Sequence, residues 1–427
     1  MPRVRAPELH ALRLLKLIYE RGQISRTELA SLTGYSAFHV SKLCERLLAG
    51  DYIVESGSGQ STGGRRPTLL SLTPKLGRIL GVHVGTLNAR LVVTDIAGNQ
   101  LAFLREPSRA QEGPDAALSH LIRLIERVLA DAETKPGELL GIGLGISGIL
   151  DRATGTTLFW PKAPQWVNVR VRDRIQEHFP THIEVEDTPR TMALAERRLG
   201  LARDIDNFIY IMIGAGVGSA LFFGGQLYTG RGGFAGEIGH VSLKDTGPLG
   251  VCGNRGSVET LVSAGALIGQ AQEAMSRGVS TSLWHLCGGD PSRISVELIA
   301  DAARAGDRFC MRLLSEAADY IGKAIVTMVQ LLDPEQIVLG GGLVTAAGQM
   351  LLPVIRQVVD EHSLPLVRDP VQIQLSELRE ADWATGASLL VADKVLEDLF
   401  LSGSRAGTGS SRTRHAARGR RKRQQAL

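Results

Sequence analysis

Residues 81–95 read GVHVGTLNARLVVTD, two β-rich segments on either side of a turn that begins at a glycine. The longer segment ILGVHVGTLNARLVVTDIAGNQL (79–101) shares its plan with FIYIMIGAGVGSALFFGGQLY (208–228). Each has a β-rich strand, a glycine-containing turn, a second β-rich strand, and then a glycine before a polar residue. The repetition predicts two similar hairpins whose turns present backbone N–H groups that can bind an anion such as a phosphate.

The segments between and after these hairpins alternate between strands and helices. GELLGIGLGISGILD (137–151) is another glycine-interrupted apolar strand, and LDPEQIVLGGGLV (332–344) is a strand that enters a glycine-rich turn. Helical patterns occur at 169–179, 188–200, around 346–361 and 381–400. Alternating strands and helices predict an α/β fold with two lobes. The duplicated hairpin is typical of an actin/hexokinase-like (ribonuclease H-like) ATPase fold.

The composition is that of a soluble globular protein with two or three domains. The 427 residues are 44% hydrophobic and 22% charged, and the four cysteines lie far apart without a CxxC pair. That cysteine usage favours reduced thiols. No apolar run approaches the roughly 20 residues that span a bilayer, and the charged N-terminus is a poor signal peptide. We therefore expect a cytoplasmic protein without a membrane segment.

Charge is distributed unevenly along the chain. Residues 1–75 hold 11 Lys and Arg against 6 Asp and Glu, residues 76–401 hold 29 against 38, and residues 402–427 hold 8 against none. Basic ends on an acidic body indicate either contact with a polyanion or solvated surface charge. Residues 402–427 lack apolar periodicity, so we expect a disordered basic tail. Such a tail either adds non-specific DNA affinity or solubilises the end of the chain.

The first 75 residues carry the pattern of a helix-turn-helix. A helix is expected over 7–21, the SRTE sequence at 25–28 is a capping box for a short second helix, and Ser36 can cap a third. The apolar stripe of the third helix consists of Val40, Leu43, Cys44 and Leu47, with His39, Lys42 and Arg46 opposite. This helix would enter the major groove. The residues expected at the DNA are Ser36, Ala37, His39, Val40 and Lys42, with His39 on either a base or a phosphate.

A wing is expected after the third helix. DYIVESG and TLLSLTP read as two strands, and the glycine-rich tip SGQSTGGRRP between them contains Arg65 and Arg66. These arginines could reach phosphates or a minor groove. The alternative for residues 1–75 is a three-helix packing or dimerisation module. The combination of three helices, a basic stripe and a basic wing favours DNA binding.

The chain resembles the ROK (repressor, ORF, kinase) family over nearly all of residues 8–400. GGRRPTLLSL (63–72) looks like its wing and linker, and FAGEIGHVSL (234–243) and CGNRGSVET (252–260) look like its signature. The resemblance implies an actin-like ATPase fold, a sugar or sugar-derivative ligand, and an oligomer, which we expect to be a homodimer or homotetramer.

The resemblance also implies that kinase chemistry has been lost. In the family's kinases an Asp stands where this chain has His83, and the proton-accepting Asp stands where it has Thr188. A neutral imidazole is a poor ligand for a hard cation, and a threonine hydroxyl cannot accept a proton at neutral pH. Asp187 could replace the base only by a register shift, which Pro189 would disturb. We therefore expect no catalytic residue and no bound ATP.

The family's sugar-binding residues are partly retained. The resemblance assigns sugar hydroxyls to Glu237, His240 and Glu259, since carboxylates accept paired hydrogen bonds from vicinal hydroxyls. Lys162 and Arg190 stand where the family has Asn, so they could pair with an acidic or unusual sugar. The alternative is that Glu237 and Glu259 form structural salt bridges in a pocket that binds nothing.

The family's structural zinc site is incomplete here. It uses one His and three Cys, and of these positions only His240 and Cys252 remain, while Gly250 and Ser257 replace the others. We therefore expect no metal. A partly buried thiol and imidazole in a hydrogen-bonded loop is the simpler interpretation.

These observations together predict a DNA-binding transcriptional regulator, acting as a repressor of carbohydrate uptake or catabolism, with a catalytically inactive sensor body. Its expected partners are operator DNA and a sugar effector. Its domains would be a winged helix-turn-helix (1–75), the sensor (76–401) and the tail (402–427). Two alternatives stay open: a ROK sugar kinase with a DNA-binding head, and a regulator controlled by a protein partner without a sugar effector.

Overall fold

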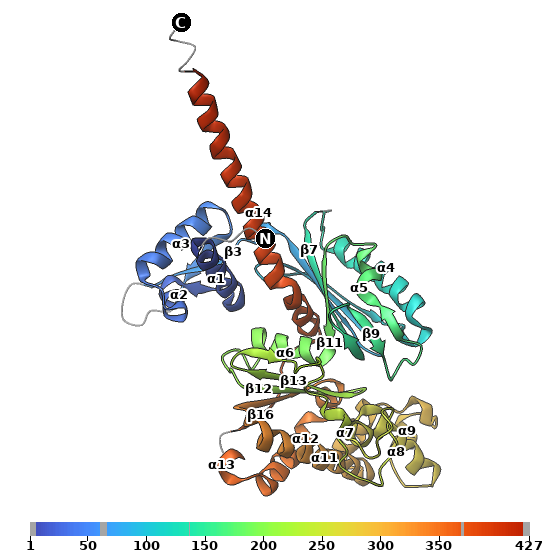
Figure 1. Cartoon of the computed structure of the whole chain (residues 1–427). Coiled ribbons are helices and arrows are strands. Elements are labelled where there is room, and N and C mark those ends of the chain that lie inside the picture. Colours follow the sequence, from blue (N-terminus) through green and yellow to red (C-terminus); the bar gives the residue numbers. More distant parts are fainter. Residues whose placement is uncertain (1–5, 60–65, 136, 369–370, 422–427) are drawn as a thin grey trace.

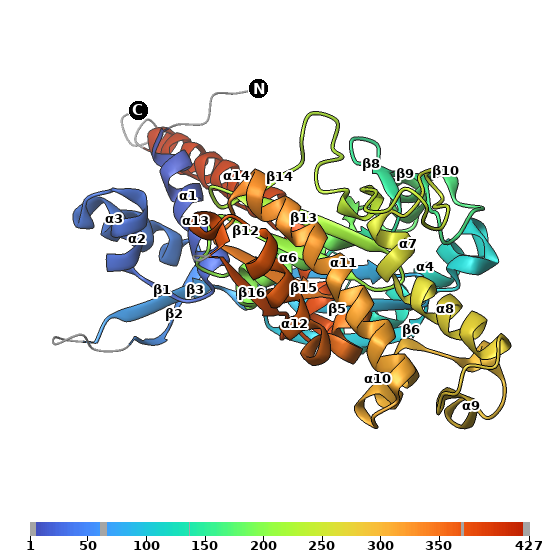
Figure 2. The same cartoon turned by 90° about the horizontal axis from the view of Figure 1, so that it is seen from below.

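The computed structural model describes residues 6–59, 66–135, 137–368 and 371–421. A small N-terminal head is followed by two α/β lobes (Figure 1), and a view from below shows the head at one end of the molecule (Figure 2). This order of parts is the one predicted from the sequence.

The head contains three helices and a small antiparallel sheet. Its elements are α1 (Ala6–Arg21), β1 (Ile24–Ser25), α2 (Arg26–Thr33), α3 (Ala37–Ala49), β2 (Ile53–Ser58) and β3 (Thr68–Leu72), with strand order β1-β3-β2. The predicted capping box is present, because Ser25 Oγ accepts a bond from Glu28 N and Glu28 Oε2 accepts one from Ser25 N. Gly34 ends α2 with a φ of 71°, a conformation that favours glycine. The result is the expected winged helix-turn-helix.

The first lobe is built on a five-stranded sheet in the order β11-β7-β4-β5-β6. The first hairpin supplies β4 (Arg78–Val84) and β5 (Asn88–Asp95), which pair antiparallel. The other elements are β6 (Gln100–Pro107), α4 (Pro114–Asp131), β7 (Leu139–Ile146), β11 (His182–Asp187), α5 (Val171–Gln176) and a small sheet of β8 (Ile149–Asp151), β9 (Thr156–Phe159) and β10 (Val167–Arg170). Helix α4 packs against β5 and β6.

The second lobe contains the sheet β14-β13-β12-β15-β16. Read in reverse, from β16 to β14, its strands follow the same order along the chain as those of the first sheet read from β11 to β6. Its strands are β12 (Phe208–Ile213), β13 (Val217–Phe223), β14 (Gln226–Tyr228), β15 (Gln336–Gly340) and β16 (Gln372–Leu375). Its helices are α6 (Thr188–Leu199), α7 (Val258–Val262), α8 (Ala264–Ser276), α9 (Leu283–Leu286), α10 (Val296–Arg304), α11 (Arg308–Leu332), α12 (Gly342–His362) and α13 (Pro365–Arg368). The shared strand order confirms the duplication predicted from the two glycine-turn hairpins.

Helix α14 (Glu380–Arg421) connects the lobes to the head. It packs against the first sheet, and Gly143 permits this close approach, because a Cβ there would lie 1.7 Å from Ala387 O. Further along, its buried side chains join the core of the head: Val391, Ala392, Val395, Leu396 and Phe400. The head is therefore packed onto the body by a shared apolar core.

The disorder expected for residues 402–427 is not observed over residues 402–421. Helix α14 continues to Arg421 and projects away from the body (Figure 1), so the expected boundary at 401 falls inside one helix. A helix that is already nucleated by packing can extend without the cost of a new first turn. The composition of residues 402–427 alone does not indicate that a packed helix precedes them. Residues 422–427 lie outside the described residues.

One helix of the described chain, α12, is long and apolar enough to cross a membrane by length and composition. Much of it is buried, and it packs mainly against α11, as a core helix does.

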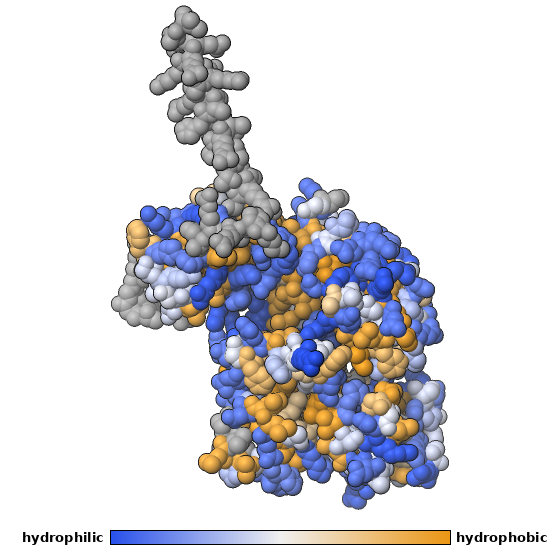
Figure 3. All heavy atoms as spheres, in the orientation of Figure 1, coloured by the Kyte–Doolittle hydropathy of each residue, from blue (hydrophilic) through white to orange (hydrophobic). Residues whose placement is uncertain are grey.

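On the face drawn in Figure 3, polar residues predominate at the outer edges, while apolar residues gather in the hollow where α14 lies in Figure 1.

Candidate functional site

The third helix of the head presents a mixed set of side chains. Ser36 caps α3 by accepting a bond from His39 N at 3.2 Å, and Ser36, Ala37 and Lys42 are exposed as expected. Val40 is fully buried in the head core, so the expectation that it faces the bases is wrong. Its place in the apolar stripe with Leu43 already indicated this.

His39 is held within the head. Its Nε2 lies 3.1 Å from Nδ1 of His10, and its ring meets Tyr35 edge-on at 5.4 Å between centroids. This three-ring contact joins α1 to the start of α3. Its expected contact with DNA, on either a base or a phosphate, stays a prediction.

Phe38 is absent from the residues of α3 that the sequence analysis places at the DNA. Its side chain is 71% exposed, and the ammonium of Lys42 lies 5.0 Å from its ring centroid. A large aromatic residue outside the apolar stripe of a recognition helix was the available signal.

The wing is formed by β2 and β3, which pair antiparallel from Ile53 opposite Leu72 to Ser58 opposite Thr68. Arg66 precedes β3 and is exposed. Arg65 lies outside the described residues, so its expected contact with DNA stays a prediction.

A cavity of about 560 Å³ lies between the two lobes, a size typical of small-molecule sites. The turns of both hairpins line it, through Gly85 and Thr86 of the first and residues 214–218 of the second. Gly341 and Gly342, at the N-terminus of α12, complete this wall. The two repeated glycine turns therefore meet across one cleft.

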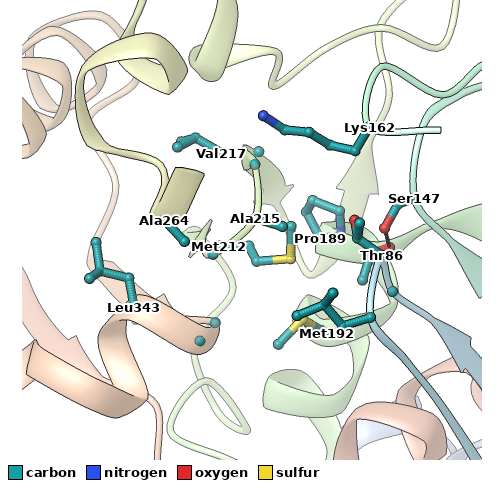
Figure 4. Close-up of a pocket in the computed structure, with 18 of the residues that line it drawn as sticks. Thr86, Ser147, Lys162, Pro189, Met192, Met212, Ala215, Val217, Ala264 and Leu343 are labelled. Carbon is teal, nitrogen blue, oxygen red and sulfur yellow. Dashed lines mark hydrogen bonds between the residues drawn. The ribbon is translucent and has the colours of Figure 1, made fainter. Parts of the chain in front are cut away.

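Figure 4 shows how the two lobes face each other across this cleft. Thr86 and Ser147 lie on the side of the first lobe, and Ala215 and Val217 lie on the side of the second. Lys162 extends across the cavity from the first lobe. A ligand bound here would touch both lobes, so its binding would bias how far they close.

His83 and Thr188, the two positions where the resemblance places aspartates of the family's kinases, both line the cleft. His83 is buried, and burial together with the nearby Arg90 guanidinium lowers its pKa to about 3, so the imidazole is neutral at physiological pH. Its ring packs near Trp383, with 5.8 Å between centroids. Thr188 is also buried, and its hydroxyl lies 3.2 Å from that of Ser147. Neither side chain is a carboxylate that could hold a divalent cation or accept a proton.

Asp187 does line the cleft, directly before α6. Its Oδ1 accepts a bond from Arg190 N at 3.0 Å, which makes it the N-cap of the helix. Burial, and next the charge of Glu186, raise its pKa to about 7. Pro189 does not disturb this geometry, because proline is well accommodated in the first turn of a helix. An acid therefore faces the cleft beside the position where the family's kinases carry their base.

We expect the free energy of unfolding to fall as the pH rises from about 4 to about 7, more steeply than in Asp187→Asn. The unfolded carboxyl loses its proton near pH 4, whereas the folded one keeps it until about pH 7. The contribution of the Asp187 carboxyl to the free energy of unfolding is therefore complete below pH 4, and it is lost as the pH rises through this window. Urea titrations at four pH values would measure it, and parallel profiles would contradict it. Asn is a suitable control because it also caps helices.

Four of the five predicted ligand-binding residues line the cleft: Lys162, Glu237, His240 and Glu259, with Arg190 as the exception. Glu259 Oε2 accepts a bond from Val217 N at 3.0 Å, and its Oε1 lies 3.9 Å from Lys162 Nζ. Glu237 lies 3.9 Å from His240. Burial raises the pKa of Glu237, and the nearby His240 partly offsets this. The structure thus brings two carboxylates, an imidazole and an ammonium to one cavity.

Arg190 does not line the cleft, and the expectation that it contacts the ligand is wrong. Its side chain is 2% exposed and donates to Glu186 Oε1, and to the carbonyl oxygens of Gly233 and Ala235 at 2.7 and 3.0 Å. Its position in the first turn of α6 directs it beneath the cleft floor. There it anchors the segment that leads to Glu237.

The expected absence of metal stays a prediction. His240 closes a 3₁₀ turn (Ile238–His240), and Cys252 is exposed in the following loop. The Ser257 hydroxyl donates to Thr260 at 3.4 Å. In the part of the chain that the structure describes, no three His, Cys, Asp or Glu side chains are grouped to hold a metal ion.

Known proteins with similar sequences include both regulators and enzymes. A model of the ROK family matches residues 79–394. A xylose repressor of Caldicellulosiruptor bescii is 28% identical over 91% of this chain and 96% of its own. A glucokinase of Thermotoga maritima is 28% identical over 75% of this chain and 99% of its own. The crystal structure of a ROK family transcriptional regulator, a homologue of the Escherichia coli MLC protein, matches with a TM-score of 0.75 and 26% identity over 93% of this chain and 98% of its own.

Proposed function

Because this chain belongs to the ROK family, we propose that it is a DNA-binding transcriptional repressor of carbohydrate uptake or catabolism, controlled by a sugar or sugar derivative. The main support is that a winged head is packed onto a body whose cleft is lined by Glu237, His240 and Glu259. The similarity to a repressor extends over both head and body, whereas the similarity to a glucokinase covers less of the chain. Such a protein would work in the cytoplasm, where its operator lies.

Two helices run from the cleft to the head and could carry the signal. Helix α6 begins beside Asp187, and near its other end the Arg198 guanidinium lies 5.2 Å from the Tyr19 ring centroid and donates to Glu20 O. Just beyond α6, Asp204 pairs with Arg21 at 2.6 Å. Movement of the cleft floor would therefore reach α1 directly.

Helix α14 makes the second connection. At its start Glu380 pairs with Arg90 at 2.9 Å and with Arg105 at 3.2 Å at the edge of the cleft. The helix packs closely on α6, because a Cβ at Gly386 would lie 2.0 Å from Thr191 O. Lobe closure would thus shift two packed helices that both contact the head.

We expect a homodimer or homotetramer, because paired recognition helices suit a palindromic operator with half-sites one or two helical turns apart. A change in lobe angle would alter the spacing of the two heads. A coupling of about 1–3 kcal/mol is typical and sufficient to release an operator. Genome-wide footprinting of the full chain, with and without a panel of sugars, tests the proposal. The absence of any footprint would overturn it.

We expect no sugar-dependent ATP turnover, because a neutral His83 and the Thr188 hydroxyl replace the carboxylates that phosphoryl transfer requires. A coupled assay with pentoses, hexoses and N-acetylhexosamines would measure this. The presence of Asp187 in the cleft makes the assay informative. Turnover that Glu237→Ala abolishes would establish instead a sugar kinase with a DNA-binding head.

A further inference from the structure

The exposed end of the recognition helix is apolar. Phe38 is the second residue of α3, and its side chain is 71% exposed. The core stripe of the same helix, which includes Val40 and Leu43, points the other way into the head. Figure 2 shows α3 at the end of the molecule away from the lobes. The body therefore leaves the Phe38 ring uncovered.

Among the exposed neighbours of Phe38 at the start of α3, only Lys42 is of a type that reads adenine or guanine. The exposed residues in the first seven positions, counted from the cap Ser36, are Ser36, Ala37, Phe38 and Lys42. Asn and Gln recognise adenine, and Arg or Lys recognise guanine, through paired hydrogen bonds. The ammonium of Lys42 lies 5.0 Å from the Phe38 ring centroid, a cation–π contact.

In the major groove, the thymine C5-methyl group is the apolar feature of the base edges. We propose that Phe38 is a specificity-determining residue that contacts thymine methyl groups of the operator. The proposal rests on the proposed function, since it requires that α3 enters the groove. It commits to DNA as the partner of this ring, because the ring stands at the end of α3 that a helix-turn-helix directs at the bases.

The test removes only the methyl group. Duplexes selected by the full chain from a random pool would be resynthesised with each thymine replaced, one at a time, by deoxyuridine. Burying one methyl-sized group is worth about 0.8 kcal/mol, or about fourfold in affinity. We expect about a fourfold loss at one or two thymines of each half-site. Phe38→Ala should bind the thymine and deoxyuridine duplexes equally well.

Lys42→Ala is the matched control on the same face. It should keep the sensitivity to deoxyuridine while reducing the salt dependence of binding by about one counterion. The deoxyuridine series on the wild type needs no variant, so the test does not depend on how Phe38→Ala folds.

The outcomes separate the inference from the proposed function. Failure to select any duplex would overturn both. Selection of a duplex whose thymines tolerate deoxyuridine, or a Phe38→Ala protein with unchanged thymine dependence, would overturn the inference and leave DNA binding intact. A change of oligomeric state in Phe38→Ala without any deoxyuridine effect would assign the ring to a contact between copies, and would also overturn it.

Discussion

Glu259→Ala is expected to abolish the response to the effector and to leave operator binding intact, so that repression cannot be relieved. The Glu259 carboxylate is largely buried, and Val217 N in the second glycine turn holds one of its oxygens. Each hydrogen bond from a sugar hydroxyl to a charged group contributes about 1.5–3 kcal/mol. Loss of two such bonds lowers affinity by roughly 100-fold or more.

Calorimetry against sugars, sugar acids and sugar phosphates would measure the affinity, and fluorescence anisotropy of a labelled operator would measure its release. Glu297→Ala is the matched control, because Glu297 also lines the cleft but is exposed on α10. Equal affinity in Glu259→Ala and wild type would assign Glu259 to a structural salt bridge with Lys162. Uniform silence of the wild type would favour control by a protein partner.

The sequence predicted the architecture well because its signals are local. Alternating apolar residues and glycine turns predicted both hairpins, and the structure contains both. The apolar stripe of α3 is also a local signal, and the place of Val40 in it could have excluded that residue from the DNA surface. The Asp-Thr-Pro start of α6 carried a capping signal that identifies Asp187 as its N-cap. Pro189 there supports the helix start rather than disturbing it.

The features that the sequence did not predict depend on contacts between residues that are far apart in the chain. Arg190 was expected in the cleft, but its partners include the carbonyl oxygens of Gly233 and Ala235, more than forty residues further along the chain. The pairing of His39 with His10 spans two helices. The docking of α14 against the head likewise brings together opposite ends of the chain. No periodicity or motif within one segment reports such contacts.

Phe400→Ala is expected to loosen the head from the body, so that the operator is still bound but the effector no longer releases it. Phe400 is 2% exposed, and its ring lies 5.4 Å from that of Tyr52 and 5.7 Å from the Arg46 guanidinium. Truncating a buried Phe costs about 3–5 kcal/mol, a large part of what a packed interface between head and body can supply. Calorimetric melting should then show the head unfolding separately, before the lobes.

Phe103→Ala, an exposed position on β6, controls for the chemistry of the substitution. Arg198→Ala offers a milder break at the α6 contact with Tyr19, in case Phe400→Ala prevents folding. It should leave effector affinity unchanged and reduce the release of the operator, because α6 would no longer hold α1. Full effector-driven release in both Phe400→Ala and Arg198→Ala would show that the signal does not pass through these helices. The lobes would then have to act by moving whole protomers relative to each other.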